Sequence, residues 1–384
     1  MFKSILKKLI ILFFIFFSTQ ECFAINKFKF KNLPNAGQFC KTLLSELNFP
    51  GYPDKKYLPL KVNTELLVEE ITNIDGKSLS YDAFYTLWYY WKDPRVIEVL
   101  KKLKEYEDTD EPAYLCDYEA KTVWGEERRL FDPVIEIYNQ KNLPKFSERA
   151  DWVEILSNGT IQARLRFNGN FKSGNLDFRK FPFDKKTFSF ELYPEFPNSI
   201  VEFVLDPKMS EYEKNLYKAE GEDGLIIPDW EVKGVKAKVI TYKEDKYNYS
   251  GVVVDVDAKR QVPYYIFKIM LPIFFLLVIT WSVFWIYGSE IEAKVNISIV
   301  TLLALIAYNF IFDKDLPKLP YLTFLDAYIL ISYFFAGMAT ILCVYSYLRY
   351  RKYKNKINKV DHYAKYIGPL LYFVSNLSVF SYFF

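Results

Sequence analysis

Four hydrophobic segments follow one another in the last third of the chain, and they restrict the fold more than any other feature. They cover residues 264–287, 293–312, 321–348 and 367–384. Each meets or approaches the roughly 20 apolar residues that a helix needs to cross a bilayer. The sequence therefore predicts a membrane domain of four helices over residues 263–384.

The linker between the third and fourth segments indicates how these helices are oriented. Its sequence, RYRKYKNKINKVDHYAK, has seven Lys or Arg and one acid. Basic loops stay in the cytoplasm, so with four spans the N-terminal domain and the C-terminus both lie outside. Residues 1–24 agree, because their basic start, apolar stretch and Cys22-Phe23-Ala24 end are typical of a cleavable signal peptide. A retained signal anchor is the alternative interpretation.

The chain upstream of the membrane domain predicts a β-sandwich. Strand-like runs alternate apolar and polar residues, and Asn158-Gly159 in VEILSNGTIQARLRF predicts a tight hairpin turn. A second hairpin pairs WEVKGVKAKVITY with GVVVDVDAKRQ. We expect the sandwich over residues 59–262, preceded by an extension, residues 25–58, with a short helix near 39–47. The predicted fold is thus an α+β membrane protein, with a β-sandwich followed by a four-helix bundle.

Two shorter stretches interrupt the β pattern, and two cysteines precede the membrane domain. VIEVLKKLKEYED, after Asp93, has apolar residues at helical spacing, whereas residues 211–224 are mostly charged. Cys40 and Cys116 can form a disulfide in an oxidising compartment, and two free thiols are the alternative. The third, Cys343, lies within a predicted span.

Composition excludes several classes of protein. The net charge of +3 is too small to indicate a nucleic-acid partner. The only histidine is His362, in the basic linker, and no nucleophile motif or metal-ligand spacing is visible. We therefore predict neither an enzyme nor a protein with a cofactor or resident metal.

The second span has a sorted face. At 100° per residue, six side chains fall within a sector of about 80°, while Lys294 and Thr301 lie on the opposite side. These six are Glu292, Asn296, Val300, Leu303, Ala307 and Phe310. Acid and amide groups are costly in lipid, so several copies around an axis would place them on a water-filled pore. Ordinary helix packing, with Glu292 at the interface, is the alternative.

The order of the motifs resembles that of the pentameric ligand-gated ion channels, the Cys-loop receptor superfamily, in its bacterial branch of proton-gated cation channels. LDFRKFPFDKKTF, residues 176–188, is similar to the family's signature loop, without its two cysteines. WKDP holds the family's W-x-D motif, and FDPVIEIYN resembles its W-x-P strand with Phe131 in place of Trp. KIMLPIFFLLVITWSVFW and EAKVNISIVTLLALIAYN resemble the first span and the pore helix. The resemblance covers residues 59–384 and implies a homopentamer in the bacterial inner membrane with a periplasmic N-terminal domain.

The resemblance also implies a layer of residues that couples the two domains. Arg260 is a candidate partner for Asp184 and Asp75, since a partly buried guanidinium needs carboxylates; a surface arginine beside lipid headgroups is the alternative. Two prolines stiffen the linker before the third span, or simply form a turn. The predicted coupling residues are Asp75, Phe181, Pro182, Phe183, Asp184, Arg260, Pro317, Pro320 and Tyr321.

The agonist is implied to bind between neighbouring β domains, beneath the tip of the second hairpin. The candidate ligand residues are Phe131, Tyr242, Tyr247 and Tyr249, which can form an aromatic cage for an amine or serve only in packing. Protons are a second candidate agonist, acting on perturbed carboxylates. Carboxylates such as Glu222, Asp223, Glu244 and Asp245 can hold Ca²⁺ or simply be solvated.

The resulting hypothesis is a cation-selective channel opened by a small molecule or by protons. Its expected partners are further copies of the same chain, membrane lipid and permeant monovalent cations. Its alternative is a non-conducting membrane receptor that binds a ligand through the β domain.

Overall fold

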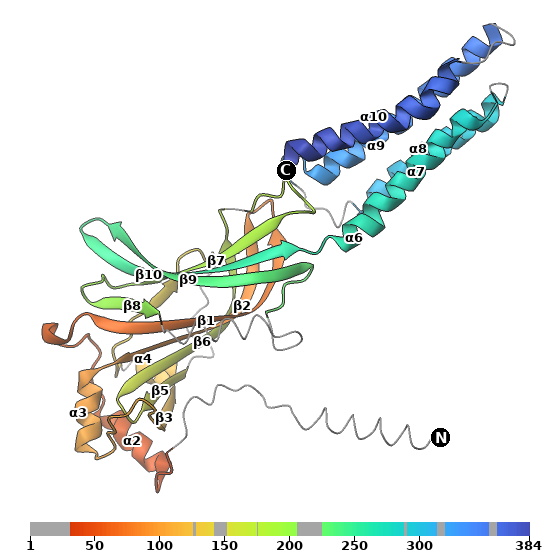
Figure 1. Cartoon of the computed structure of the whole chain (residues 1–384). Coiled ribbons are helices and arrows are strands. Elements are labelled where there is room, and N and C mark those ends of the chain that lie inside the picture. Colours follow the sequence, from red (N-terminus) through yellow and green to blue (C-terminus); the bar gives the residue numbers. More distant parts are fainter. Residues whose placement is uncertain are drawn as a thin grey trace, which may run out of the picture.

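The computed structural model describes residues 31–125, 128–141, 152–174, 176–205, 225–287, 290–312, 319–352 and 359–384. The expected signal peptide, the charged segment 211–224 and Pro317 lie outside these residues. Within them, a β domain and a bundle of helices follow one another along the long axis of the molecule (Figure 1).

The β domain is a sandwich of two sheets, as predicted. The six-stranded sheet has the order β3-β5-β6-β2-β1-β8, and the four-stranded sheet has the order β4-β7-β10-β9. The first sheet contains β1 (Leu60–Asp75), β2 (Ser80–Lys92), β3 (Tyr114–Glu119), β5 (Trp152–Leu156), β6 (Thr160–Lys172) and β8 (Val201–Leu205). The second contains β4 (Ile135–Ile137), β7 (Lys185–Pro194), β9 (Trp230–Glu244) and β10 (Tyr247–Arg260).

Both predicted hairpins are present. The β5–β6 turn is closed by Asn158 and Gly159, and Gly159 has a φ of 77°, a conformation that glycine adopts without steric cost. In the β9–β10 hairpin, Tyr242 pairs directly with Tyr249. This register places both rings on one face of the four-stranded sheet.

Aromatic side chains fill the space between the two sheets. Tyr81 of β2 is fully buried, stacks on Phe171 and meets Phe188 and Phe190 of β7 edge to face. Its hydroxyl donates a hydrogen bond of 2.6 Å to the carbonyl of Ser189 across the sandwich. The apolar contacts and the satisfied hydroxyl together fix the spacing of the sheets.

Short helices cover the end of the β domain that lies far from the membrane helices (Figure 1). They are α2 (Ala36–Glu46), η1 (Lys55–Tyr57), α3 (Pro94–Lys102) and α4 (Ala120–Trp124). Helix α2 is attached to β3 by a Cys40–Cys116 disulfide, and its Leu43 is fully buried. The structure thus selects the disulfide from the two alternatives left open by the sequence.

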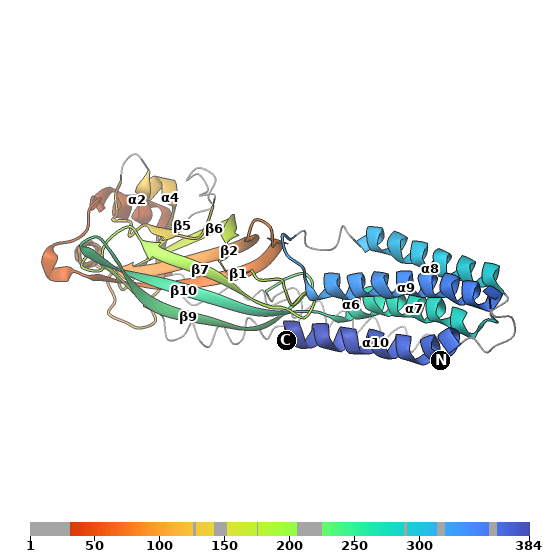
Figure 2. The same cartoon turned by 90° about the horizontal axis from the view of Figure 1, so that it is seen from above.

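The membrane domain is a bundle of roughly parallel helices (Figure 2). Its elements are α6 (Pro263–Tyr265), a π-helical stretch η3 (Ile266–Met270), α7 (Leu271–Ser282), η4 (Val283–Trp285), α8 (Ile291–Phe312), α9 (Phe324–Lys352) and α10 (Lys359–Phe383). Among the described helices, three are long and apolar enough to cross a membrane, Pro263–Trp285, Ile291–Phe310 and Phe324–Lys352. Helix α10 covers the fourth predicted span up to Phe383 and begins eight residues earlier than expected.

Candidate functional site

The six predicted pore residues all lie on an exposed face of α8. Val300, Leu303 and Phe310 have exposed fractions of 56%, 58% and 72%, and the other three are exposed as well. The opposite side of the helix is buried, with Ser298 0% and Thr301 6% exposed. Helix α8 therefore has one face that the subunit itself leaves uncovered, and this face runs from a carboxylate through an amide to apolar side chains.

Lys294 lies on the buried side of α8. Its ammonium is 2.8 Å from a carboxylate oxygen of Asp361 at the start of α10. Only 1% of the lysine is exposed. The single basic residue in the first turns of α8 is thus held within the subunit, on the side facing the other helices.

A buried ion pair links β10 to the loop between β6 and β7. The guanidinium of Arg260 donates to both oxygens of Asp184, with N–O distances of 2.8 and 3.3 Å. Arg260 also lies over the rings of Trp230 and Phe181, at 4.1 and 4.7 Å. Both charged groups are buried, and removing them from water costs free energy. The two hydrogen bonds of the ion pair and the contacts of the guanidinium with the aromatic rings offset this cost.

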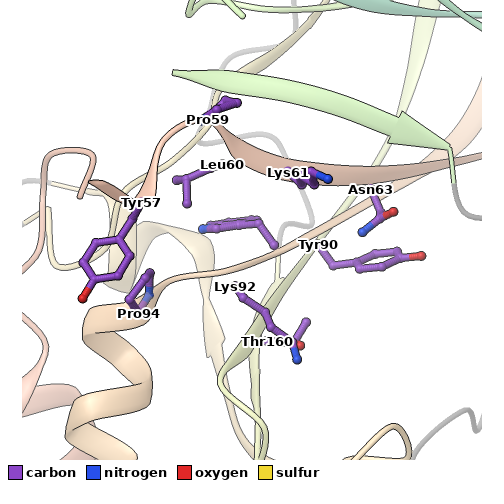
Figure 3. A pocket seen from close by; sticks show the side chains of 10 residues that line it. Tyr57, Pro59, Leu60, Lys61, Asn63, Tyr90, Lys92, Pro94 and Thr160 are labelled. Atoms are coloured by element: carbon purple, nitrogen blue, oxygen red, sulfur yellow. The ribbon is translucent and has the colours of Figure 1, made fainter. Parts of the chain in front are cut away.

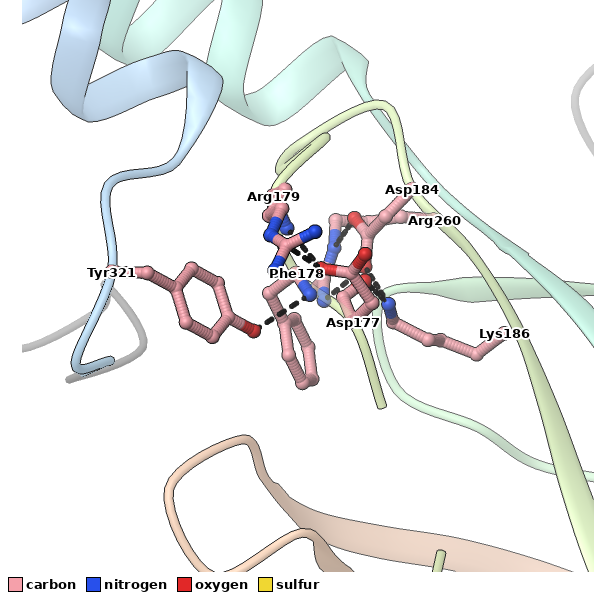
Figure 4. Close-up of polar contacts among 7 residues, drawn as sticks. All are labelled: Asp177, Phe178, Arg179, Asp184, Lys186, Arg260 and Tyr321. Atoms are coloured by element: carbon pink, nitrogen blue, oxygen red, sulfur yellow. Dashed lines mark hydrogen bonds and ion pairs between the residues drawn. The ribbon is translucent and has the colours of Figure 1, made fainter. Parts of the chain in front are cut away.

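A second cation shares the same carboxylate. The ammonium of Lys186 lies 3.5 Å from Asp184, 4.3 Å from the ring of Phe178, and donates to the carbonyl of Asp177 (Figure 4). Burial lowers the pKa of Lys186, and Arg260 adds to this effect, while Asp184 and Asp177 oppose it. Asp75, the other predicted partner of Arg260, instead accepts hydrogen bonds from Ser78 and the backbone of Lys77, and these lower its pKa.

The same loop is bonded to the beginning of the third membrane helix. The backbone N–H of Phe178 donates to the hydroxyl of Tyr321 (3.0 Å; Figure 4). The backbone N–H of Phe324 donates to the carbonyl of Arg179 (2.8 Å). Phe181 and Phe183 contact Tyr265 and Phe324 edge to face. The loop therefore contacts β10, the first membrane helix and the third within a few residues.

The β1–β2 turn belongs to this junction as well. At Gly76, an added Cβ would come within 2.6 Å of Leu319 and 2.7 Å of Phe178, so only glycine allows the turn to approach this closely. Of the predicted coupling residues that the structure describes, five make the contacts of this junction: Phe181, Phe183, Asp184, Arg260 and Tyr321. Pro182 lies in the same loop, Asp75 is bonded within its own turn, and Pro320 is exposed.

Tyrosine rings form a cluster on the outward face of the four-stranded sheet. Tyr242 stacks on Tyr249 at 5.1 Å and meets Tyr193 at 4.4 Å, and Tyr193 meets Tyr138 at 5.7 Å. An added Cβ on Gly251 would lie 2.3 Å from Tyr193, so this glycine makes room for the ring. Burial and the nearby Glu244 raise the pKa of Tyr242 to about 12, so its hydroxyl stays protonated.

Two of the four predicted ligand residues lie apart from this tyrosine cluster, which consists of Tyr138, Tyr193, Tyr242 and Tyr249. Phe131 is buried, and its ring packs against Phe196 at 5.2 Å and Tyr52 at 6.3 Å, so it is a core residue. Tyr247 is 57% exposed at the hairpin tip.

Tyr138 and Tyr193 belong to the cluster but are not among the ligand residues predicted from the sequence. Tyr138 is the second-to-last residue of the FDPVIEIYN motif, whose first residue is the predicted Phe131, and Tyr193 lies at an outward position of the alternating strand FSFELYP. Alternation along that strand was the available signal, because residues two apart share a face.

A carboxylate lies two residues from Tyr193 on the same strand face. Burial raises the pKa of Glu191, and the negative charge of Asp255 raises it further. Among the described residues, no group of three or more His, Cys, Asp or Glu side chains is placed to hold a metal ion. Glu222 and Asp223, two of the carboxylates considered for Ca²⁺, lie outside those residues.

A pocket of about 370 Å³ opens where β1 begins and β2 ends (Figure 3). Its lining combines lysines with aromatic and small polar groups. The lining residues are Tyr57, Pro59, Leu60, Lys61, Asn63, Tyr90, Trp91, Lys92, Pro94 and Thr160. None of the predicted site residues lines it.

Two family profiles match successive parts of the chain. The neurotransmitter-gated ion-channel ligand binding domain matches residues 36–262, and the neurotransmitter-gated ion-channel transmembrane region matches residues 269–366. The chain belongs to the neurotransmitter-gated ion-channel family. The resemblance drawn from the motifs is confirmed, and the match to the first domain extends back to include α2. This pentameric channel family is non-enzymatic, and membership implies ligand binding, pentameric assembly and a multi-pass membrane protein with an extracellular ligand-binding domain.

Individual relatives of this ion channel come from bacteria and animals. The chain is 28% identical over 325 residues to a proton-gated ion channel of Gloeobacter violaceus, covering 83% of this chain and 82% of the relative. It is 21% identical to a Drosophila melanogaster gamma-aminobutyric acid receptor subunit beta-like protein, covering 85% of this chain and 64% of the relative. It is 25% identical to the Mus musculus gamma-aminobutyric acid receptor subunit theta, covering 85% of this chain and 48% of that subunit. The chain thus spans about half to two thirds of these animal subunits.

Proposed function

We propose that this chain forms a homopentameric, cation-selective channel in the inner membrane of a bacterium, with α8 lining the pore. The observation that carries the proposal is the exposed face of α8, on which Glu292 marks the cytoplasmic end while Lys294 is turned inward and paired. Five such faces around an axis would ring the mouth with carboxylates, which concentrate cations and repel anions. Leu303, near the middle of the helix, would contribute an apolar ring that closes the pore by dewetting.

The junction around Arg260 supports transmission from the outer domain to the pore. The loop between β6 and β7, which carries Asp184, contacts β10 on one side and the starts of two membrane helices on the other. Separating a buried ion pair is energetically costly, because it leaves a buried charge uncompensated. Movement of β10 is therefore expected to displace the loop and the helices together. In this proposal the linker before α9 converts that displacement into tilting of the neighbouring α8.

The tyrosine cluster is the proposed agonist site. Four rings on one sheet face, with the carboxylate of Glu191 close by, provide the aromatic and negative surroundings that attract an organic ammonium ion. Protons are the second candidate agonist, and the specific observation in their favour is the raised pKa of Glu191. Neutralising this carboxylate would relieve its repulsion with Asp255.

Reconstitution of the purified protein in planar bilayers tests the proposal. Pulses of acid and a panel of small amines would be applied to the face that carries the β domain, while single-channel currents are recorded. We expect openings evoked by one of these stimuli, with a reversal potential near that of Na⁺ in a NaCl gradient. Ligand binding to a correctly assembled protein that passes no current would favour the alternative, a non-conducting receptor.

A further inference from the structure

Three membrane helices meet at a buried polar cluster near their cytoplasmic ends. The ammonium of Lys294 on α8 is 2.8 Å from one carboxylate oxygen of Asp361 on α10, and the hydroxyl of Ser346 on α9 donates to the other at 2.7 Å. The exposed fractions are 1% for Lys294, 8% for Asp361 and 1% for Ser346. This burial exists within a single subunit, so the cluster does not need a neighbouring copy to exclude water.

The position of Asp361 is fixed by packing that does not involve Lys294. The indole N–H of Trp281 donates to the carbonyl of Ala364, one turn further along α10, at 2.9 Å. At Gly368, one more turn along, an added Cβ would lie 2.0 Å from the indole ring. The first turns of α10 therefore pack directly against Trp281, and the carboxylate is a fixed point to which the flexible lysine side chain is attached.

Lys294 and Glu292 carry opposite charges on opposite sides of the same helical turn. Two residues along an α-helix correspond to about 200°, so the exposed Glu292 and the buried Lys294 point away from each other. A lysine stem is long enough to carry its ammonium to nearby water when no partner holds it. A free ammonium at the mouth would oppose the field of the carboxylate on its own subunit.

We infer that Asp361 is a selectivity-positioning residue: it holds the ammonium of Lys294 inside the helix bundle, so that this positive charge does not offset the charge of Glu292 at the cytoplasmic mouth of the pore. The inference rests on the proposed pore along α8. It assigns to α10, which lies outside the pore face, a direct effect on which ions pass.

The test compares reversal potentials in a NaCl gradient for wild type and four variants in bilayers. The variants are Asp361→Asn, Asp361→Glu, Lys294→Met and the double variant Lys294→Met/Asp361→Leu. We expect Asp361→Asn to lower the Na⁺ to Cl⁻ permeability ratio about fivefold or more, because it leaves the ammonium unpaired. Asp361→Glu, which keeps the charge, and the double variant, which has no ammonium, should match wild type. Lys294→Met should be at least as cation-selective as wild type.

Loss of packing alone would not produce this pattern, because removal of the lysine would not restore selectivity to a channel that lacks the aspartate. An unchanged permeability ratio in Asp361→Asn would overturn the inference. Should that variant fail to assemble, Asp361→Ser, which also leaves the ammonium without its carboxylate, decides: a lowered permeability ratio supports the inference, and a wild-type ratio overturns it. A wild-type channel that prefers Cl⁻ would refute the proposed cation selectivity, whereas the shift between variants would still test the role of Asp361.

Discussion

Arg260 and Asp184 form a two-point hydrogen-bonded ion pair, with N–O distances of 2.8 and 3.3 Å, at the place where the β domain meets the membrane helices. The pair joins the last residue of β10 to the loop that contacts Tyr265 and Tyr321. Strand β10 also carries Tyr249 of the tyrosine cluster near its other end. One strand therefore connects the proposed agonist site with the junction.

Replacement of Arg260 by alanine should impair gating without removing the agonist site. The change leaves Asp184 buried beside Lys186 alone, and loss of one partner of a buried pair costs about 3 kcal/mol or more. Arg260→Lys should be only partly effective, because an ammonium cannot bond both carboxylate oxygens in the way a guanidinium does. The measurement is agonist-evoked current per assembled pentamer. Lys259→Ala, at the exposed preceding residue, is the control; currents from Arg260→Ala that equal those of this control would disprove the coupling role.

Leu303 is expected to form the narrowest dry ring of the closed pore. Leu303→Ser should wet that ring and raise the resting current, or lower the agonist concentration needed for half activation. Leu302→Ser, at a half-buried position beside it, should have the smaller effect. The measurement is the open probability of single channels in the absence of agonist. If Leu303→Ser leaves both the leak and the dose response unaltered, the gate lies elsewhere.

The Cys40–Cys116 disulfide should stabilise the outer domain. It closes a loop with a sequence separation of 76 residues, and a bridge of this kind typically contributes about 2–4 kcal/mol to the free energy of unfolding. Reduction, or the double variant Cys40→Ala/Cys116→Ala, should therefore lower the melting temperature of the β domain. Cys343→Ser, at the buried free thiol of α9, serves as the control for reduction. An unchanged melting temperature on reduction would show that α2 is held by packing alone.

Glu191 provides a test of protons as the agonist. Its pKa lies above the usual 4.5, so over the interval between 4.5 and the raised value the folded protein binds a proton that the unfolded chain has lost. This contribution to stability is present at low pH and is lost as the pH rises through that interval. Glu191→Gln should remove this part of the pH dependence and raise the free energy of unfolding at pH values above that interval.

The same variant separates the two candidate agonists. If protonation of Glu191 opens the channel, the permanently neutral glutamine should move half activation to higher pH, whereas Glu136→Gln, at an exposed position on β4, should not. Identical proton dose responses for the two variants would argue against protons acting through Glu191, and the amine panel would then be the decisive experiment.

The order of the elements was predictable from the sequence because local rules determined it. Alternation and turn residues determined both hairpins, and length and hydropathy determined the first three spans. The face of α8 followed from helical periodicity alone, since Glu292 and the five residues that share its sector are all exposed.

Relationships between distant residues could not be predicted in the same way. The motif predicts Phe131 as a ligand residue, but its ring is buried ahead of β4, and Tyr138 of the same motif is exposed instead. The sequence shows Asp361 only as the single acid of a basic linker, whereas α10 begins earlier than predicted and places this residue in the bundle beside Lys294. Such partners are set by tertiary packing across 67 residues of chain, for which no local pattern exists.

The reversal potential in a NaCl gradient tests the central claim most directly, because it reports the sign of the ion that passes along α8. Wild type should reverse near the Na⁺ potential. Glu292→Ala should lose much of that preference, since it removes the ring of carboxylates at the cytoplasmic mouth. Glu290→Ala, at the exposed residue just before α8 begins, is the matched control. A wild-type reversal at the Cl⁻ potential, or a Glu292→Ala channel as cation-selective as wild type, would contradict the assignment of this pore.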